Sequence, residues 1–144
     1  MSIWFDKSIT LDNIIDFGRD TMASCLGMKW VAIGDDFLKL SMPINEKTRH
    51  SYPYGFLHGG ASCALAETVG SIASALVIDM DKDICATMEI NANHIRSAEE
   101  GIITAHCTPL HLGKRTHVWD IKISDNAERL VCISRLTVAI ISKR

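Results

Sequence analysis

The spacing of hydrophobic residues predicts two helices in the first half of the chain. Apolar residues recur at the helical period over residues 10–24, where Thr10 is placed to cap the helix and Gly27 to end it. A longer helix is predicted over about 59–78, before an acidic run that begins at Asp79. Apolar side chains surround most of its axis, so this second helix is expected to be buried on most sides.

The remaining segments carry strand patterns. Short strands are predicted at 28–34 and 37–43, followed by a loop over 45–57 that is rich in Tyr, Pro and Gly. After the long helix, apolar and polar residues alternate, which is typical of strands with one buried face. Four long strands are therefore predicted at 84–96, 102–112, 116–124 and 129–141.

This order of elements predicts an α+β fold in which an antiparallel sheet wraps around the helix at about 59–78. In the first long strand, the alternation places Met88 on the same face as Ile90, Ala92 and His94. The length of 144 residues suits one hydrophobic core, so the whole chain is expected to form a single domain.

Composition and charge exclude several classes of function. The formal net charge is -2 without a basic cluster, so neither nucleic acid nor a membrane is an expected partner. The N-terminus lacks the basic start and apolar run of a signal peptide. The 5 cysteines are scattered and form no CxxC pair. This spacing argues against a metal site or a disulfide framework and favours a cytoplasmic protein with reduced thiols.

A single carboxylate, Glu67, interrupts the apolar helix. At about 100° per residue, Glu67 shares one narrow stripe with Gly60, Cys63, Ser71 and Ser74. A solvent-facing stripe is the simplest interpretation, but such a stripe would normally carry Lys, Arg or several Glu. Small residues instead suit the close approach of another helix, a partner chain or a ligand. Glu67 is therefore a candidate functional residue.

The same helix begins with His58, Gly59 and Gly60. The first N–H groups of a helix have no partner inside it and lie at the positive end of its dipole. A plain glycine-rich turn would explain this motif. The functional interpretation is an oxyanion site, in which a backbone N–H binds a carbonyl oxygen that gains charge during the reaction.

The separation between Gly59 and Glu67 has a consequence for assembly. The two residues are eight positions apart in the sequence, which is about 12 Å along a helix axis. One small carbonyl group cannot comfortably touch both residues of a single chain. If both act, two antiparallel helices must meet about a two-fold axis, so the sequence predicts at least a homodimer with composite sites.

The segments HGGASCALAETVGS, EINANHIRSA and PLHLGKRTHVW resemble the acyl-CoA thioesterases of the hotdog superfamily. The resemblance is strongest to the branch acting on aromatic thioesters, such as dihydroxynaphthoyl-CoA, hydroxybenzoyl-CoA and the substrates of enterobactin proofreading. It implies the hotdog fold and hydrolysis of an acyl-CoA, with coenzyme A as part of the substrate and no metal or redox cofactor. It also implies a homotetramer built as a dimer of dimers, and leaves open whether acyl or aryl carrier protein thioesters are substrates.

Carried over to the matching positions, the resemblance makes Glu67 the catalytic carboxylate, acting as nucleophile or as general base. Gly59 would donate its backbone N–H to the thioester carbonyl, with His58 beside it. Ser71 would help to place the carboxylate or the water. His94 would line the acyl pocket.

The resemblance also implies residues that bind the substrate. Tyr52 stands where this branch often has a Gln that helps to position the thioester; its phenol can also donate a hydrogen bond but is larger and differently shaped. The candidates for coenzyme A are Arg96 and Ser97 after the first long strand, and Lys114 and Arg115 in a turn.

Two other function classes remain as alternatives. A hotdog acyl-CoA hydratase or dehydratase would use His58 and Glu67 across the dimer to move a proton, although the chain lacks the HFP loop that is usual in such enzymes. A non-catalytic acyl-CoA-binding domain would bind the ligand without turnover.

Overall fold

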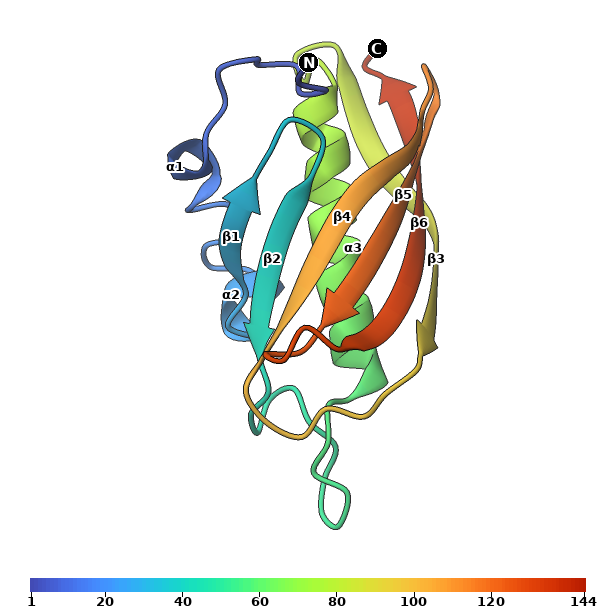
Figure 1. Cartoon of the computed structure of the whole chain (residues 1–144). Helices are drawn as coiled ribbons and strands as arrows, with labels where there is room; N and C mark the ends of the chain where they lie inside the picture. The colour runs from blue at the N-terminus through green and yellow to red at the C-terminus, as the bar shows by residue number, and fades with distance from the viewer.

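The structure, a computed structural model, describes residues 1–144 and contains one six-stranded sheet, one long helix and two short helices (Figure 1). The helices are α1 (Leu11–Ile14), α2 (Met22–Cys25) and α3 (Gly59–Val77). The strands are β1 (Lys29–Ile33), β2 (Leu38–Pro43), β3 (Asp83–His94), β4 (Ile102–Leu112), β5 (Thr116–Ser124) and β6 (Leu130–Ser142). The α+β prediction is confirmed, and all six predicted strands are present.

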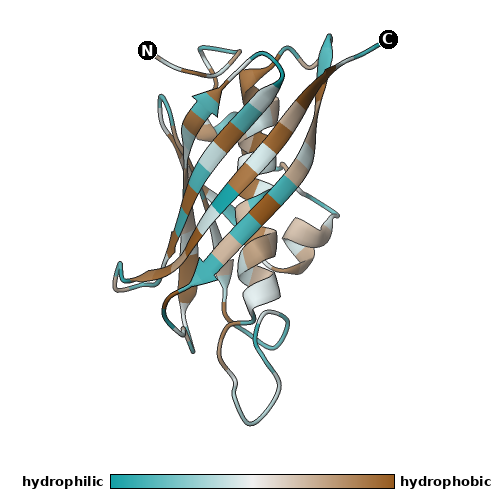
Figure 2. Ribbon diagram, turned by 90° about the vertical axis from the view of Figure 1, so that its right-hand side faces the viewer, coloured by the Kyte–Doolittle hydropathy of each residue, from teal (hydrophilic) through white to brown (hydrophobic).

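The sheet is antiparallel throughout and has the strand order β1-β2-β4-β5-β6-β3. It curves around α3, which contacts every strand from β2 to β6 (Figure 1). Hydrophobic and hydrophilic residues alternate along the strands in Figure 2, as expected when one face covers a core and the other meets solvent. Because β3 lies at the end of this order, one of its two edges has no neighbouring strand.

The core is the contact between α3 and the inner face of the sheet. Leu65, Ala66, Val69 and Ala73 of α3 are fully buried. The buried sheet residues that form the same cluster include Leu40, Ile103, Trp119, Ile121, Ile123 and Leu136. The length and composition of α3 would allow it to cross a membrane, but here it is the core helix of the sheet that wraps it.

The single helix predicted over residues 10–24 is wrong. The chain forms only the short helices α1 and α2 there, because Gly18 (φ 92°) and Asp20 (φ 58°) adopt positive φ values between them. Helical residues need negative φ, so the chain turns instead of continuing as a helix. The Trp30 indole N–H donates to the Phe17 carbonyl at 3.0 Å and anchors this irregular segment beside β1.

The predicted face of β3 is also wrong at one position. The pairing of β3 with β6 shifts register between Thr87 and Glu89, which is the signature of a β-bulge at Met88. Before the bulge, Cys85 and Thr87 are partly buried. After it, Ile90 is the next partly buried residue, whereas Met88 is 64% exposed. The extra residue exchanges the two faces of the strand, so Met88 does not share the inner face with His94.

Candidate active site

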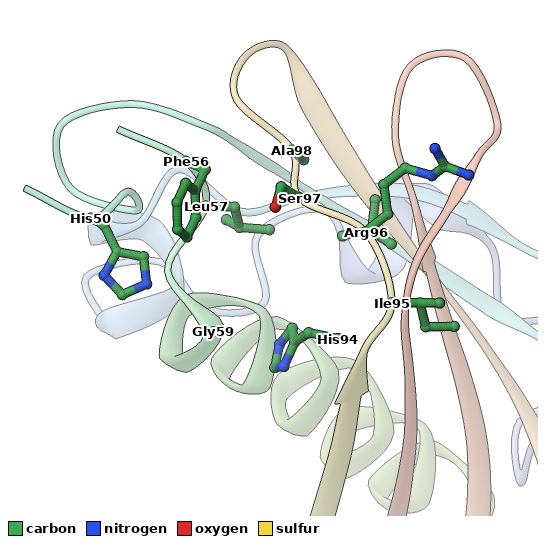
Figure 3. A pocket seen from close by; sticks show the side chains of 10 residues that line it. His50, Phe56, Leu57, Gly59, His94, Ile95, Arg96, Ser97 and Ala98 are labelled. Carbon is green, nitrogen blue, oxygen red and sulfur yellow. The ribbon is translucent and has the colours of Figure 1, made fainter. Parts of the chain in front are cut away.

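A cavity of about 320 Å³ lies at the N-terminal end of α3 (Figure 3). It brings together four of the residues predicted from the sequence: Gly59, His94, Arg96 and Ser97. Figure 3 shows the His94 imidazole beside the first turn of α3, where β3 ends. His50, which the sequence did not single out, lines the same cavity.

His58 is the N-cap of α3. Its backbone is extended, and its Nδ1 accepts the N–H of Gly60 at 2.8 Å. Because Nδ1 accepts this bond, the proton of the neutral ring is on Nε2. The ring of His50 lies against that of His58, with 4.3 Å between centroids. His58 is therefore held in one orientation with a single N–H left to donate.

His94 is held by the buried residue Ser62. The Ser62 hydroxyl lies 2.6 Å from Nε2 of His94 and also donates to the carbonyl of Gly59 at 2.9 Å. A Cβ at Gly59 would come within 3.2 Å of Cε1 of His94, and one at Gly60 within 3.0 Å of Nδ1 of His58. The groups that approach these two glycines closely are thus imidazoles of the protein itself.

The N–H of Gly59 is a free backbone donor at this cavity. Gly59 is the first residue of α3, so its N–H has no acceptor within the helix. The neighbouring N–H of Gly60 is already used by the cap of His58. A carbonyl oxygen in this cavity would therefore meet one backbone donor at the positive end of a helix of 19 residues.

A second cavity, of about 310 Å³, lies midway along α3 and contains Glu67 and Ser71. Its other walls include Phe17, Met22 and Trp30 from the irregular N-terminal segment and β1. Glu67 is the one ionisable side chain that lines it. The cavity therefore combines a single carboxylate with apolar and aromatic walls.

The Glu67 carboxylate is bound by a residue that the sequence did not indicate. The hydroxyl of Thr87 on β3 donates to its Oε1 at 2.8 Å. Ser71 lines the same cavity but makes no hydrogen bond to the carboxylate, and its carbonyl accepts the thiol of Cys85 at 3.7 Å. Burial raises the pKa of the Cys85 thiol, and the charge of Glu67 raises it further.

The stripe predicted on α3 ends earlier than expected. Gly60, Cys63, Glu67 and Ser71 remain accessible, but Ser74 is completely buried. Strand β5 covers this last residue. The Ser74 hydroxyl accepts the indole N–H of Trp119 at 2.7 Å and lies 3.2 Å from Nδ1 of His117. Ser74 belongs to the core rather than to a site.

Tyr52 lies outside both cavities. Its side chain is 94% exposed in the loop that precedes α3, before a cis bond to Pro53. A separate hollow of the loop is lined by Tyr52 together with Arg49 and His50. The single chain therefore does not bring Tyr52 together with Gly59.

Lys114 and Arg115 lie at the end of the molecule opposite to Arg96. The carbonyl of Arg115 accepts the N–H of Ile140, near the end of β6, whereas His94 pairs with Cys132 at the start of β6. Eight residues of a strand span about 26 Å. One chain therefore cannot use both groups of basic residues at one cavity.

Three candidate functional residues were not predicted from the sequence, each for a different reason. Thr87 was hidden by the bulge, which the alternation of residues cannot reveal. Ser62 looked like one more small residue in a helix, and only its burial beside His94 distinguishes it. His50 belongs to a loop without periodicity, where no pattern predicts what a side chain contacts.

Residues 54–132 match the thioesterase superfamily. The chain is 45% identical to the 1,4-dihydroxy-2-naphthoyl-CoA hydrolase of Escherichia coli, over 96% of this chain and 99% of that protein. It is 40% identical to the proofreading thioesterase EntH of Cronobacter sakazakii, over 96% of this chain and 98% of that protein.

The fold is likewise similar to that of known thioesterases. The crystal structure of a variant thioesterase from Pseudomonas aeruginosa matches with a TM-score of 0.92 and 39% identity, covering 99% of this chain and 100% of that one. This similarity confirms the arrangement of a sheet around a central helix. The chain therefore belongs to the thioesterase superfamily, and it is a thioester hydrolase with the hotdog fold.

Proposed function

We propose that the protein hydrolyses an aromatic acyl-CoA to the free acid and coenzyme A, at sites shared between two subunits. The observation that carries this proposal is the cavity of Glu67, in which one carboxylate faces walls that include Phe17, Met22 and Trp30. A planar aromatic acyl group suits such walls. The similarity to a 1,4-dihydroxy-2-naphthoyl-CoA hydrolase supports the same class of acyl group.

In this proposal, the thioester carbonyl binds at the N-terminal end of α3. The free N–H of Gly59 donates to the carbonyl oxygen and stabilises the charge that develops there. His58 and His94 flank this point, and each is fixed by a hydrogen bond to α3. Glu67 then acts on the carbonyl carbon directly or through a water molecule, and the thiolate of coenzyme A leaves.

The two halves of the site are proposed to come from different subunits. In one chain, Gly59 and Glu67 line separate cavities, as their spacing along α3 predicts. The unpaired edge of β3 offers a surface for a second copy, and Ile84 and Met88 on this strand are exposed. Antiparallel pairing of two β3 strands would place the Gly59 end of one helix beside the Glu67 region of the other.

Further residues are proposed to bind the substrate. Arg96 and Ser97, in the cavity of Gly59, suit the phosphates of coenzyme A. Tyr52 is proposed to reach the thioester when a second subunit covers its loop, and Ser71 to place the water beside Glu67. We also propose that Lys114 and Arg115 contact coenzyme A from the partner subunit.

The proposal also covers the cofactor requirement, the location and the assembly of the enzyme. Carboxylate-assisted hydrolysis requires no metal or redox cofactor, and the enzyme is proposed to act in the cytoplasm as a dimer of dimers. Acyl or aryl carrier protein thioesters would present the same thioester carbonyl, with the thiolate of the carrier protein as the leaving group, so they are proposed as secondary substrates.

The test is a panel of aromatic and aliphatic CoA thioesters assayed for release of free thiol, with the native enzyme and with Glu67→Gln. We expect aromatic substrates to give the higher kcat/KM, and the variant to lose about 10²–10⁴-fold in kcat with its fold intact. Full activity of Glu67→Gln would refute the proposed role. Water addition to an enoyl-CoA without thiol release would indicate a hydratase, and binding without turnover would indicate a binding domain.

A further inference from the structure

The environment of Glu67 contains one protein group that can orient its carboxylate. None of the five ion pairs of the protein involves Glu67. Its Oε1 accepts the hydroxyl of Thr87 at 2.8 Å, and no protein group donates to its Oε2. One oxygen is therefore held, and the other is free for water or for a carbonyl carbon.

The β-bulge of β3 explains how Thr87 reaches Glu67. After the bulge, Ile90 and His94 face α3. If the strand alternated without interruption from His94 backwards, Met88 would face α3 and Thr87 would face away. The extra residue at Met88 reverses this order, so Thr87 and His94 both face the helix. One strand thereby supports both the Glu67 cavity and the Gly59 cavity.

We propose that Thr87 is a positioning residue, which the bulge of β3 aims at Glu67 so that Oε1 is fixed and Oε2 points to the substrate. This inference rests on the proposed function of Glu67. A hydrogen bond from a hydroxyl to a carboxylate is charge-assisted and restricts the rotation of the carboxylate.

The experiment compares Thr87→Val, which removes the hydroxyl at nearly constant shape, with Thr87→Ser, which keeps it. We expect Thr87→Val to lower kcat by about 10- to 100-fold, with KM changed less than about twofold. A loss confined to kcat, with KM kept, is expected of a group that orients the carboxylate and does not itself bind the substrate. Thr87→Ser should keep most of the native kcat, because it retains the hydroxyl that donates to Oε1.

Thr137→Val is the matched control. Thr137 pairs with Glu89 just after the bulge, and it lies between the fully buried Leu136 and Val138, so its side chain faces away from α3. The Thr137→Val variant should leave both kcat and KM unchanged. If Thr87→Val does not fold, which circular dichroism would reveal, Thr87→Ala takes its place against Thr87→Ser.

The outcomes separate this inference from the proposed function. A native kcat in Thr87→Val, together with an inactive Glu67→Gln, would overturn the role of Thr87 alone. A Thr87→Ser variant as impaired as Thr87→Val would also overturn it, since the hydroxyl would then not matter. Full activity of Glu67→Gln would instead remove the proposed function itself.

Discussion

The two cavities along α3 are organised in opposite ways. The one at the N-terminal end offers backbone groups and the imidazole of His94, which Ser62 of the same helix holds by a hydrogen bond. The one at Glu67 offers a single carboxylate, held from a strand and surrounded by apolar walls. Each half is thus preorganised within its chain, but neither combines a carbonyl-binding donor with a carboxylate. This difference fits the proposal that each half becomes rigid when the chain folds and that the complete site forms between two subunits.

The largest loss of kcat is expected when the backbone N–H of Gly59 is removed from the N-terminal cavity. Proline is tolerated at the first position of a helix, and His58 already has the extended backbone that a residue before proline requires. Gly59→Pro should therefore keep α3 while removing the donor. We expect kcat to fall by about 10²–10³-fold in a thiol-release assay.

Gly59→Ala is the control for this substitution. It adds a similar Cβ, which would meet His94 at 3.2 Å, but it keeps the N–H. Its loss of kcat should be clearly smaller than that of Gly59→Pro. Equal losses would mean that crowding of His94, rather than the missing donor, causes the defect.

Mixing two inactive variants tests whether the halves belong to different subunits. Co-expressed Glu67→Gln and Gly59→Pro chains should regain about a quarter of native activity, because half of the dimers are mixed and each mixed dimer has one intact site. The control mixes Glu67→Gln with Glu67→Ala, whose defects lie in the same half, and it should regain nothing. If the mixture of Glu67→Gln and Gly59→Pro regains no activity although mixed dimers are present, the site lies within one chain.

A smaller effect, on KM for CoA thioesters, should differ between Arg96 and the turn that contains Lys114 and Arg115 at the other end of the molecule. Arg96→Ala is expected to raise KM for a CoA thioester about tenfold, with little change in kcat, because a charged contact to a phosphate is lost. Reversal of Lys114 and Arg115 to Glu should raise KM as well, but less. A thioester without the nucleotide is the control, and it should not distinguish any of these variants from the native enzyme.

The smallest effect concerns His117, which is buried outside both cavities. Its protonation should alter the stability of the fold and not catalysis. Burial lowers the pKa of His117, and the nearby His111 lowers it further. In the unfolded chain this imidazole takes up a proton near its usual pKa of about 6.5. Stability should therefore be complete above that pH and fall as the pH decreases toward the lowered pKa of the folded state.

Thermal unfolding at pH 7.5 and at pH 5.5, two values chosen about one unit on either side of the usual histidine pKa, measures this loss. A His117→Asn variant should show a smaller difference between the two conditions. His106, whose pKa burial also lowers, contributes in the same direction and stays present in both proteins. An unchanged difference in the variant would assign the pH dependence to other groups.

Much of the fold could be predicted because it follows from local patterns. The alternation of residues predicted the four long strands, and the apolar circumference of residues 59–78 identified the helix that the sheet wraps. The failures occurred where one residue changes the geometry of the backbone. Positive φ at Gly18 and Asp20 broke a helix that hydrophobic spacing alone supports.

The candidate site was predictable only in part for a similar reason. Glu67 and Gly59 stand out because a charge in an apolar helix and a glycine pair at its start are visible in the sequence. Their supports, Thr87 and Ser62, are ordinary hydroxyls whose importance depends on what lies opposite them in the fold. Such partners come from distant segments, and no local pattern reveals them.

The bulge at Met88 has a consequence for how this strand can vary. The Met88 side chain is 64% exposed, so many residue types should be accepted there in a single chain. Deleting the residue is different, because it would turn either Thr87 or His94 away from α3. Within one chain, the number of residues at this position is therefore constrained more strictly than their identity. A one-residue insertion or deletion should disable the enzyme even where a substitution that preserves the proposed subunit contact is accepted.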